Sequence, residues 1–71
     1  MFKKNEFKAA LARAEKSTTD VAKALDIDTS TLSRKMAGQS DFFRDEIEKI
    51  RVLLNLDWDN VREIFFAPNV E

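Results

Sequence analysis

The side chains best suited to specific recognition lie in one short polar stretch, Thr29-Ser30-Thr31-Leu32-Ser33-Arg34. When residues 29–37 are arranged as a helix, the inner face carries Leu32 and Met36, and the outward face carries Thr29, Ser30, Ser33 and Arg34. A helix face that serves only solubility more often carries Glu and Lys, because Ser and Thr are weaker helix formers. The stretch therefore indicates a surface that binds another molecule through hydrogen bonds.

Side chains for catalysis or metal binding are scarce in this chain. It contains no Cys and no His, which excludes disulfides, Cys/His metal sites and nucleophile–histidine pairs. Helix capping and the helix dipole explain the acidic residues near positions 45–48 and 57–59 better than catalysis does. We therefore expect no enzymatic activity, no metal, no cofactor and no small-molecule substrate.

The length of 71 residues predicts one small domain, residues 1–71, with a modest core. The net charge of −1 is unevenly divided. Residues 1–40 hold eight Lys/Arg and five Asp/Glu, a net charge of +3, whereas residues 41–71 hold four and eight, a net charge of −4. No apolar run approaches the roughly 18 residues of a membrane span, so we expect no membrane partner. The lack of cysteine fits a cytoplasmic location, which we also expect.

Apolar residues recur at helical spacing almost throughout the chain, and strand patterns are absent. The spacing predicts an all-α fold with helices at about residues 6–16, 18–25, 29–37, 44–55 and 58–66. Ser17, Asp28 and Asp57 are predicted N-caps, and Gly38 is the predicted stop of the third helix. The predicted core comprises Ala22, Leu25, Ile27, Leu32, Ile47, Ile50 and Leu54.

Only Asp26-Ile27-Asp28 separates the second predicted helix from the third, which predicts a helix-turn-helix unit. Ala22 is small where the two helices must cross closely, and Ile27 is an apolar residue suited to fill the turn. In such units the second helix enters the major groove of DNA. The polar face of residues 29–37 would then contact base edges, and Arg34 is suited to guanine O6 and N7.

Residues 17–38 resemble the helix-turn-helix of the phage Cro and repressor family, the XRE-type or lambda-repressor-like domains. The resemblance lies in Val21-Ala22, Leu25, Ile27, Thr31-Leu32-Ser33-Arg34 and Gly38. The continuation SDFFRDEIEKIRVLLNLDWDNVREIFF is similar to the last two helices of small Cro-like regulators. The resemblance implies a small five-helix domain that binds double-stranded operator DNA in a sequence-specific manner, as a phage or prophage transcriptional repressor.

The resemblance also implies individual DNA contacts. The base-reading positions of the family fall on Thr29, Ser30 and Arg34. The positions that contact the DNA backbone fall on Thr18, Ser33, Lys35, Gln39 and Ser40. In two places the chain departs from the family pattern, since Asp26 stands where a turn glycine is usual and Thr18 where a longer Gln is common. Asp26 and Asp28 also place negative charge near the expected DNA face.

The last predicted helix carries more aromatic residues than a small core accommodates. Cro-like proteins often act as dimers on palindromic sites, so these residues suggest a weak homodimer. The candidate interface residues are Trp58, Phe65 and Phe66, although Trp58 and Phe65 are also expected to pack in the core with Val61 and Ile64. For Phe2, Phe42 and Phe43, both a core position and an interface position remain open.

An alternative from another functional class is a helical protein-interaction module on the same scaffold, such as an antirepressor or an antitoxin. The acidic second half of the chain would then bind a basic partner. Because a scaffold does not determine function, the fold alone does not separate the two. Salt-sensitive binding to duplex DNA with a preferred sequence would distinguish the DNA-binding regulator from the interaction module.

Overall fold

The computed structural model describes residues 2–66, which form five helices and no strand within that range. The helices are α1 (Lys4–Ala14), α2 (Thr18–Leu25), α3 (Thr29–Met36), α4 (Arg44–Leu53) and α5 (Trp58–Phe65). The predicted all-α fold is confirmed, and each helix bound lies within two residues of its predicted position. None of the helices in the described range combines the length and the apolar character that crossing a bilayer requires.

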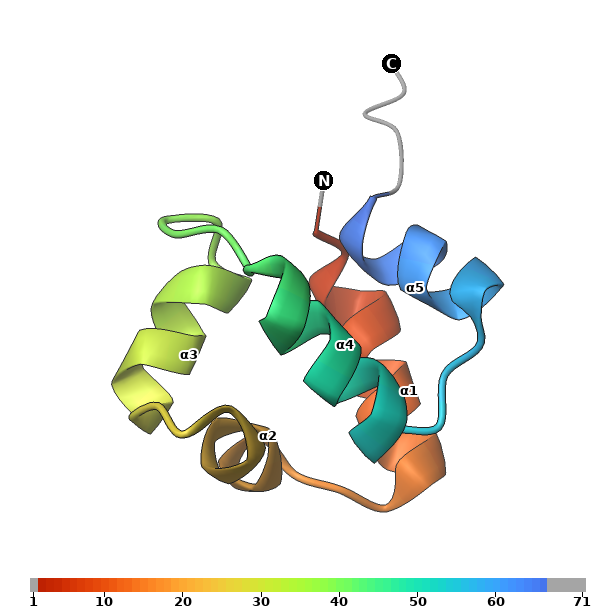
Figure 1. The fold of residues 1–71 in the computed structure, drawn as a ribbon, viewed down its shortest axis with the longest axis horizontal. Coiled ribbons are helices and arrows are strands. Elements are labelled where there is room, and N and C mark those ends of the chain that lie inside the picture. Colours follow the sequence, from red (N-terminus) through yellow and green to blue (C-terminus); the bar gives the residue numbers. More distant parts are fainter. Residues whose placement is uncertain (1, 67–71) are drawn as a thin grey trace.

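The helices enclose one core, with α3 and α5 at opposite ends of the molecule in Figure 1. Helix α2 packs against both α3 and α4, whereas α5 packs against α1 and α4. The beginning of the described chain is joined to α5, because the backbone N–H of Lys3 donates to the carbonyl oxygen of Ile64 at 2.7 Å. This arrangement leaves one side of α3 facing outward.

Local hydrogen bonds define where the helices begin. The hydroxyl of Ser17 accepts from the N–H of Asp20 at 3.2 Å, and the Asp20 carboxylate accepts from the N–H of Ser17 at 2.8 Å. Asp28 accepts from the N–H of Ser30 at 3.3 Å, and Asp57 accepts from the N–H of Asn60 at 2.8 Å. These contacts satisfy backbone donors that have no partner inside a helix, and they confirm the three predicted N-caps.

Residues with a left-handed backbone conformation, in which φ is positive, follow several of the helices. Gly38 after α3 has φ 86°, as expected for the predicted stop, and glycine adopts this region without strain. Glu15, Asp26 and Asn55 adopt φ 57°, 56° and 54°, although each carries a Cβ atom. At Asp26 this conformation turns the chain from α2 toward α3, and Ile27 N–H closes the turn on Ala22 O at 3.0 Å. Asp26 therefore takes the conformation for which the resembled family usually has glycine.

The core contains most of the residues predicted for it. Among the predicted residues, Ala22, Leu25, Leu32, Ile50 and Leu54 are buried. Ile27 and Ile47 are only partly buried, so their prediction as fully buried residues is wrong. Ile27 lies in the turn at the edge of the core, and Ile47 lines a surface groove between α4 and α5.

For Phe65 and Trp58 of α5, both a core position and an interface position are predicted, and the core position is confirmed for Phe65 but wrong for Trp58. Phe65 is buried in a cluster of rings, 5.5 Å from Phe2 and 5.2 Å from Phe42 between ring centroids. It is therefore unavailable as an interface residue, which corrects one of the three candidates. Trp58, the first residue of α5, is 62% exposed and is not a core residue. Phe66 is exposed as well.

Candidate functional site

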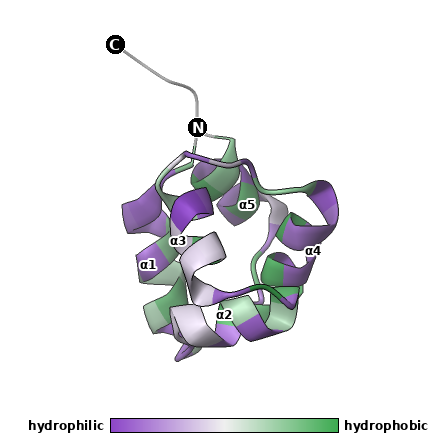
Figure 2. Ribbon diagram, turned by 90° about the vertical axis from the view of Figure 1, so that its left-hand side faces the viewer, coloured by the Kyte–Doolittle hydropathy of each residue, from purple (hydrophilic) through white to green (hydrophobic). Residues whose placement is uncertain are grey.

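The outward face of α3 carries the predicted hydrogen-bonding residues. Thr29, Ser30, Ser33 and Arg34 are all exposed, whereas Leu32 and Met36 are buried on the opposite side. Figure 2 looks onto this end of the molecule, where the ribbon of α3 faces the viewer and is largely white and purple. The short side chains leave the backbone of α3 accessible for a close approach by another molecule.

Ser30 has a fixed orientation on this face. Its hydroxyl group donates to the carboxylate of Asp28, the residue that caps α3. This hydroxyl bond, with the bond from the Ser30 backbone N–H, lowers the pKa of Asp28, and the nearby Arg34 charge acts in the same direction. Because the hydroxyl proton is used internally, the Ser30 oxygen offers its lone pairs to a ligand. Ser30 is thus presented as a hydrogen-bond acceptor.

A small open groove of about 230 Å³ runs along the α1 side of α3. Its polar lining combines the hydroxyl side chains of Thr18, Thr29 and Ser33 with Lys4 and Lys8 of α1. The structure therefore brings together three of the residues predicted from the sequence, which come from the start of α2 and from α3. The two lysines were not among the predicted residues, although their spacing of four positions is a recognisable signal for a shared helix face.

Gln39 and Ser40 lie beyond the carboxyl end of α3, away from this groove. Both are exposed, and they follow Gly38 in a turn that the N–H of Gln39 closes on the carbonyl oxygen of Arg34 at 3.0 Å. The predicted residues thus divide into the groove beside α3, the exposed face with Ser30 and Arg34, and the turn after the helix.

Among the predicted DNA contacts, Lys35 occupies a position that contradicts its prediction. Its side chain is only 4% exposed, and its ammonium nitrogen lies 3.1 Å from a carboxylate oxygen of Glu46. The same nitrogen donates to the carbonyl oxygen of Asp41 at 2.9 Å and lies 4.3 Å from the centroid of the Phe43 ring. An ammonium group held by these three partners is directed into the protein and is not a contact for a DNA phosphate.

Glu46 links Lys35 to the beginning of α4. The carboxylate accepts from the backbone N–H of Phe43 at 2.9 Å, which satisfies a donor ahead of the first turn of that helix. The side chain is 8% exposed, and its contact with the Phe43 N–H agrees with the capping role predicted for the acidic residues at the start of this helix. Together, Lys35 and Glu46 hold the chain between α3 and α4 in a defined position.

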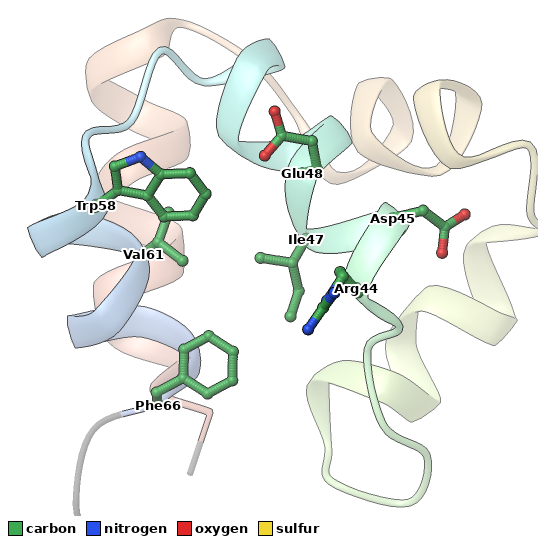
Figure 3. A pocket seen from close by; sticks show the side chains of 7 residues that line it. All are labelled: Arg44, Asp45, Ile47, Glu48, Trp58, Val61 and Phe66. Atoms are coloured by element: carbon green, nitrogen blue, oxygen red, sulfur yellow. The ribbon is translucent and has the colours of Figure 1, made fainter.

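A second surface feature lies between α4 and α5. It is an open groove of about 680 Å³. In Figure 3, Trp58, Val61 and Phe66 lie on one side of it and Ile47 faces them from α4. Arg44, Asp45 and Glu48 also line the groove, so its edge carries both signs of charge. Trp58 and Phe66 are 62% and 58% exposed, so two large apolar side chains meet solvent at this groove.

The indole ring of Trp58 is held at one end of this groove. The guanidinium carbon of Arg51 lies 4.9 Å from the centroid of the ring, and Arg51 also forms an ion pair with Glu48. The hydrogen bond from Arg51 lowers the pKa of Glu48 and raises the pKa of Arg51. Glu48, Arg51 and Trp58 thus form a connected set across α4 and the start of α5.

No family model, curated protein or solved structure matches this chain.

Proposed function

We propose that this protein is a sequence-specific DNA-binding regulator that acts on double-stranded DNA in the cytoplasm, as Cro-like phage or prophage repressors do. In this proposal α2 and α3 form a helix-turn-helix unit, and α3 lies in the major groove. Occupancy of an operator would block transcription without catalysis. The observation that supports the proposal most strongly is the exposed face of α3, where hydroxyl groups and one guanidinium replace the usual Glu and Lys.

The roles of individual side chains follow from their chemistry. Arg34 has a planar set of donors that pairs with guanine O6 and N7 through two hydrogen bonds. Ser30, with its proton directed to Asp28, accepts from the amino group of adenine or cytosine. Thr29 lies at the first position of the helix, where base contacts concentrate in helix-turn-helix proteins. Thr18, Ser33, Gln39 and Ser40 contact the DNA backbone in this proposal, and Lys35 does not.

Selection of bound duplexes from a random pool tests the proposal directly. The expected result is one enriched sequence whose binding weakens steeply with salt. A palindromic sequence would further indicate that two copies bind together. Retention of no duplex at low salt would contradict the proposal and favour the alternative, a protein-interaction module, for which the apolar groove between α4 and α5 is the supporting feature.

Arg34→Lys tests the base-reading role, because Lys retains the charge but lacks the paired donors. Loss of one such pair costs about 1–3 kcal/mol and relaxes specificity at one base position. Arg62→Lys is the matched control, because Arg62 lies on α5 and pairs with Asp59 at 2.7 Å. An unchanged preference of the Arg34→Lys variant for its selected site over random duplex would assign Arg34 to the DNA backbone instead.

We also propose that two copies associate weakly through the groove between α4 and α5, using Trp58 and Phe66. Both rings are exposed and lie at an apolar groove. The edge of the groove carries both positive and negative side chains, so in a symmetric pair each charge can face an opposite charge of the second copy. No residue of α3 lines this groove, so in this proposal the DNA face of α3 stays accessible in the associated pair. Its test is given in the Discussion.

A further inference from the structure

Two lysines of α1 lie where the proposed DNA face continues beyond α3. Lys4 and Lys8 are four positions apart, so they share one face of α1, and both are exposed. Glu6 lies between them in the sequence and points to a different side of the helix. Within residues 2–66, no ion pair involves Lys4 or Lys8.

The surroundings of these lysines are rich in hydroxyl groups. Lys4 and Lys8 line the same groove as Thr18, Thr29 and Ser33, which come from the start of α2 and from α3. Like charges four positions apart on a helix oppose each other and slightly destabilise it. An anion placed between the lysines and the hydroxyl groups would relieve this repulsion and accept hydrogen bonds from both sides of the groove.

We propose that this groove binds the phosphodiester backbone of duplex DNA, with Lys4 and Lys8 as the principal cationic contacts. The inference rests on the proposed function and adds a contact surface on α1 to it. Ammonium groups bind phosphate oxygens as point charges, and hydroxyl groups donate to the same oxygens. Since the groove is lined partly by α3, a helix that lies in the major groove in our proposal, a phosphate strand bordering that groove would pass beside it.

Charge complementarity favours an anionic occupant, and the proposed function makes that anion the DNA backbone. The groove combines two ammonium groups with three hydroxyl groups, and Asp28, which caps the start of α3, has its carboxylate engaged by Ser30. Lys35 is paired with the buried Glu46, so its ammonium group does not neutralise a DNA phosphate and other cations must supply that charge. In this proposal Arg34 contacts the bases, and the two α1 lysines neutralise phosphate charges.

The experiment measures the affinity of the full chain for a short duplex of random sequence at a series of KCl concentrations. The variants are Lys4→Ala, Lys8→Ala and the double variant, with Lys49→Ala on the exposed side of α4 as a control of equal charge change. Each lysine that contacts a phosphate contributes about one unit to the slope of log affinity against log salt. We expect the slope to fall by about one unit for each single variant and by about two for the double variant.

The outcomes separate this inference from the proposed function. If the unaltered protein binds duplex and the double variant retains its salt slope, DNA binding stands and the groove is not a phosphate site. If Lys49→Ala reduces the slope as much as Lys4→Ala, net charge explains the effect and the groove assignment is overturned. If the unaltered protein binds no duplex at low salt, both proposals fail. Circular dichroism melting of each variant excludes loss of folding as the cause.

Discussion

The ammonium nitrogen of Lys35 lies 3.1 Å from a carboxylate oxygen of Glu46, and both side chains are buried. This contact joins the last turn of α3 to the first turn of α4 across the exposed turn that contains Gln39 and Ser40. On the side of α3 opposite to the proposed DNA face, this ion pair therefore links the helix to α4. Its removal should affect the stability of the domain more than the charge of its surface.

Lys35→Met is expected to lower the free energy of unfolding by about 3–5 kcal/mol, because it leaves the buried carboxylate of Glu46 without a counter-charge. Glu46→Gln should be destabilising for the reciprocal reason. The double variant Lys35→Met/Glu46→Gln leaves no buried charge, so it should lose less stability than the sum of the single variants. Urea denaturation of the four proteins measures this coupling. Additive losses would mean that the two charges do not stabilise each other.

Leu32→Ala is expected to cost about 2–5 kcal/mol of stability, since truncation of a buried leucine removes apolar contacts and leaves a cavity. Leu32 is 1% exposed and lies on the inner face of α3. Val52→Ala is the control, because Val52 is 64% exposed and its truncation should change stability by less than about 0.5 kcal/mol. Thermal melting compares the two variants. Equal changes in the melting temperature would show that α3 is not held by its buried leucine.

Acidification should weaken the caps of α2 and α3. Hydrogen bonds from the backbone and hydroxyl of Ser17 lower the pKa of Asp20, and those from the hydroxyl and backbone of Ser30 lower the pKa of Asp28. A carboxylate whose pKa is lower in the folded state stabilises the protein above its unfolded pKa of about 3.9. That stability is lost as the pH falls through the lower folded value.

Asp28→Asn tests this pH dependence, because Asn also caps a helix but does not titrate. The variant should lose less stability than the unaltered protein between neutral pH and a pH below the folded value of Asp28. Urea midpoints at the two pH values provide the measurement. Parallel losses in the two proteins would show that Asp28 contributes nothing to the acid sensitivity.

Glu15→Gly is expected to stabilise the protein. Glu15 has φ 57°, a left-handed conformation that costs a residue with a Cβ atom about 1–2 kcal/mol. Glycine avoids this strain but has about 0.4–1 kcal/mol more chain entropy to lose on folding, so the net gain should be up to about 1 kcal/mol. Glu15→Ala is the control, since alanine retains the strain. A melting temperature that rises equally in both variants would assign the effect to the lost carboxylate.

Phe66→Ser should weaken self-association if the groove between α4 and α5 joins two copies. Sedimentation over a range of protein concentrations measures the monomer–dimer equilibrium. Val52→Ser is the matched control, because Val52 is an exposed apolar residue of α4 that does not line the groove. A monomer at all concentrations, with and without a selected DNA duplex, would refute the dimer and leave the proposed DNA contacts of α3 unaffected.

The helices were predictable because their signals are local. Ser17, Asp28 and Asp57 each bond a backbone N–H no more than three residues away, and Gly38 adopts a conformation that its own lack of a side chain permits. The inner and outer faces of α3 follow in the same way from a period of 3.6 residues. The exposed positions of Thr29, Ser30, Ser33 and Arg34 could therefore be predicted before the structure was known.

The errors concern contacts between helices. Lys35 adjoins Met36 on the buried side of α3, but its partner Glu46 lies on another helix, and no local pattern indicates that pairing. Lys4 and Lys8 were missed because only the packing of the domain brings α1 beside α3. For Trp58, helical periodicity predicts the inner side of α5, but the residue is the first of that helix and its ring lies beside the guanidinium of Arg51 on α4, a contact that periodicity does not indicate.

The contact between Lys3 and Ile64 has a consequence for the order of folding. The two residues lie 61 positions apart in the sequence. The contacts that join the start of the chain and α1 to α5, which we call the seam, therefore close the largest loop among the described residues. Contacts among α2, α3 and α4 close shorter loops and lose less chain entropy. The seam should therefore form after the transition state, and weakening the Phe2–Phe65 ring contact should accelerate unfolding while leaving the rate of folding nearly unchanged.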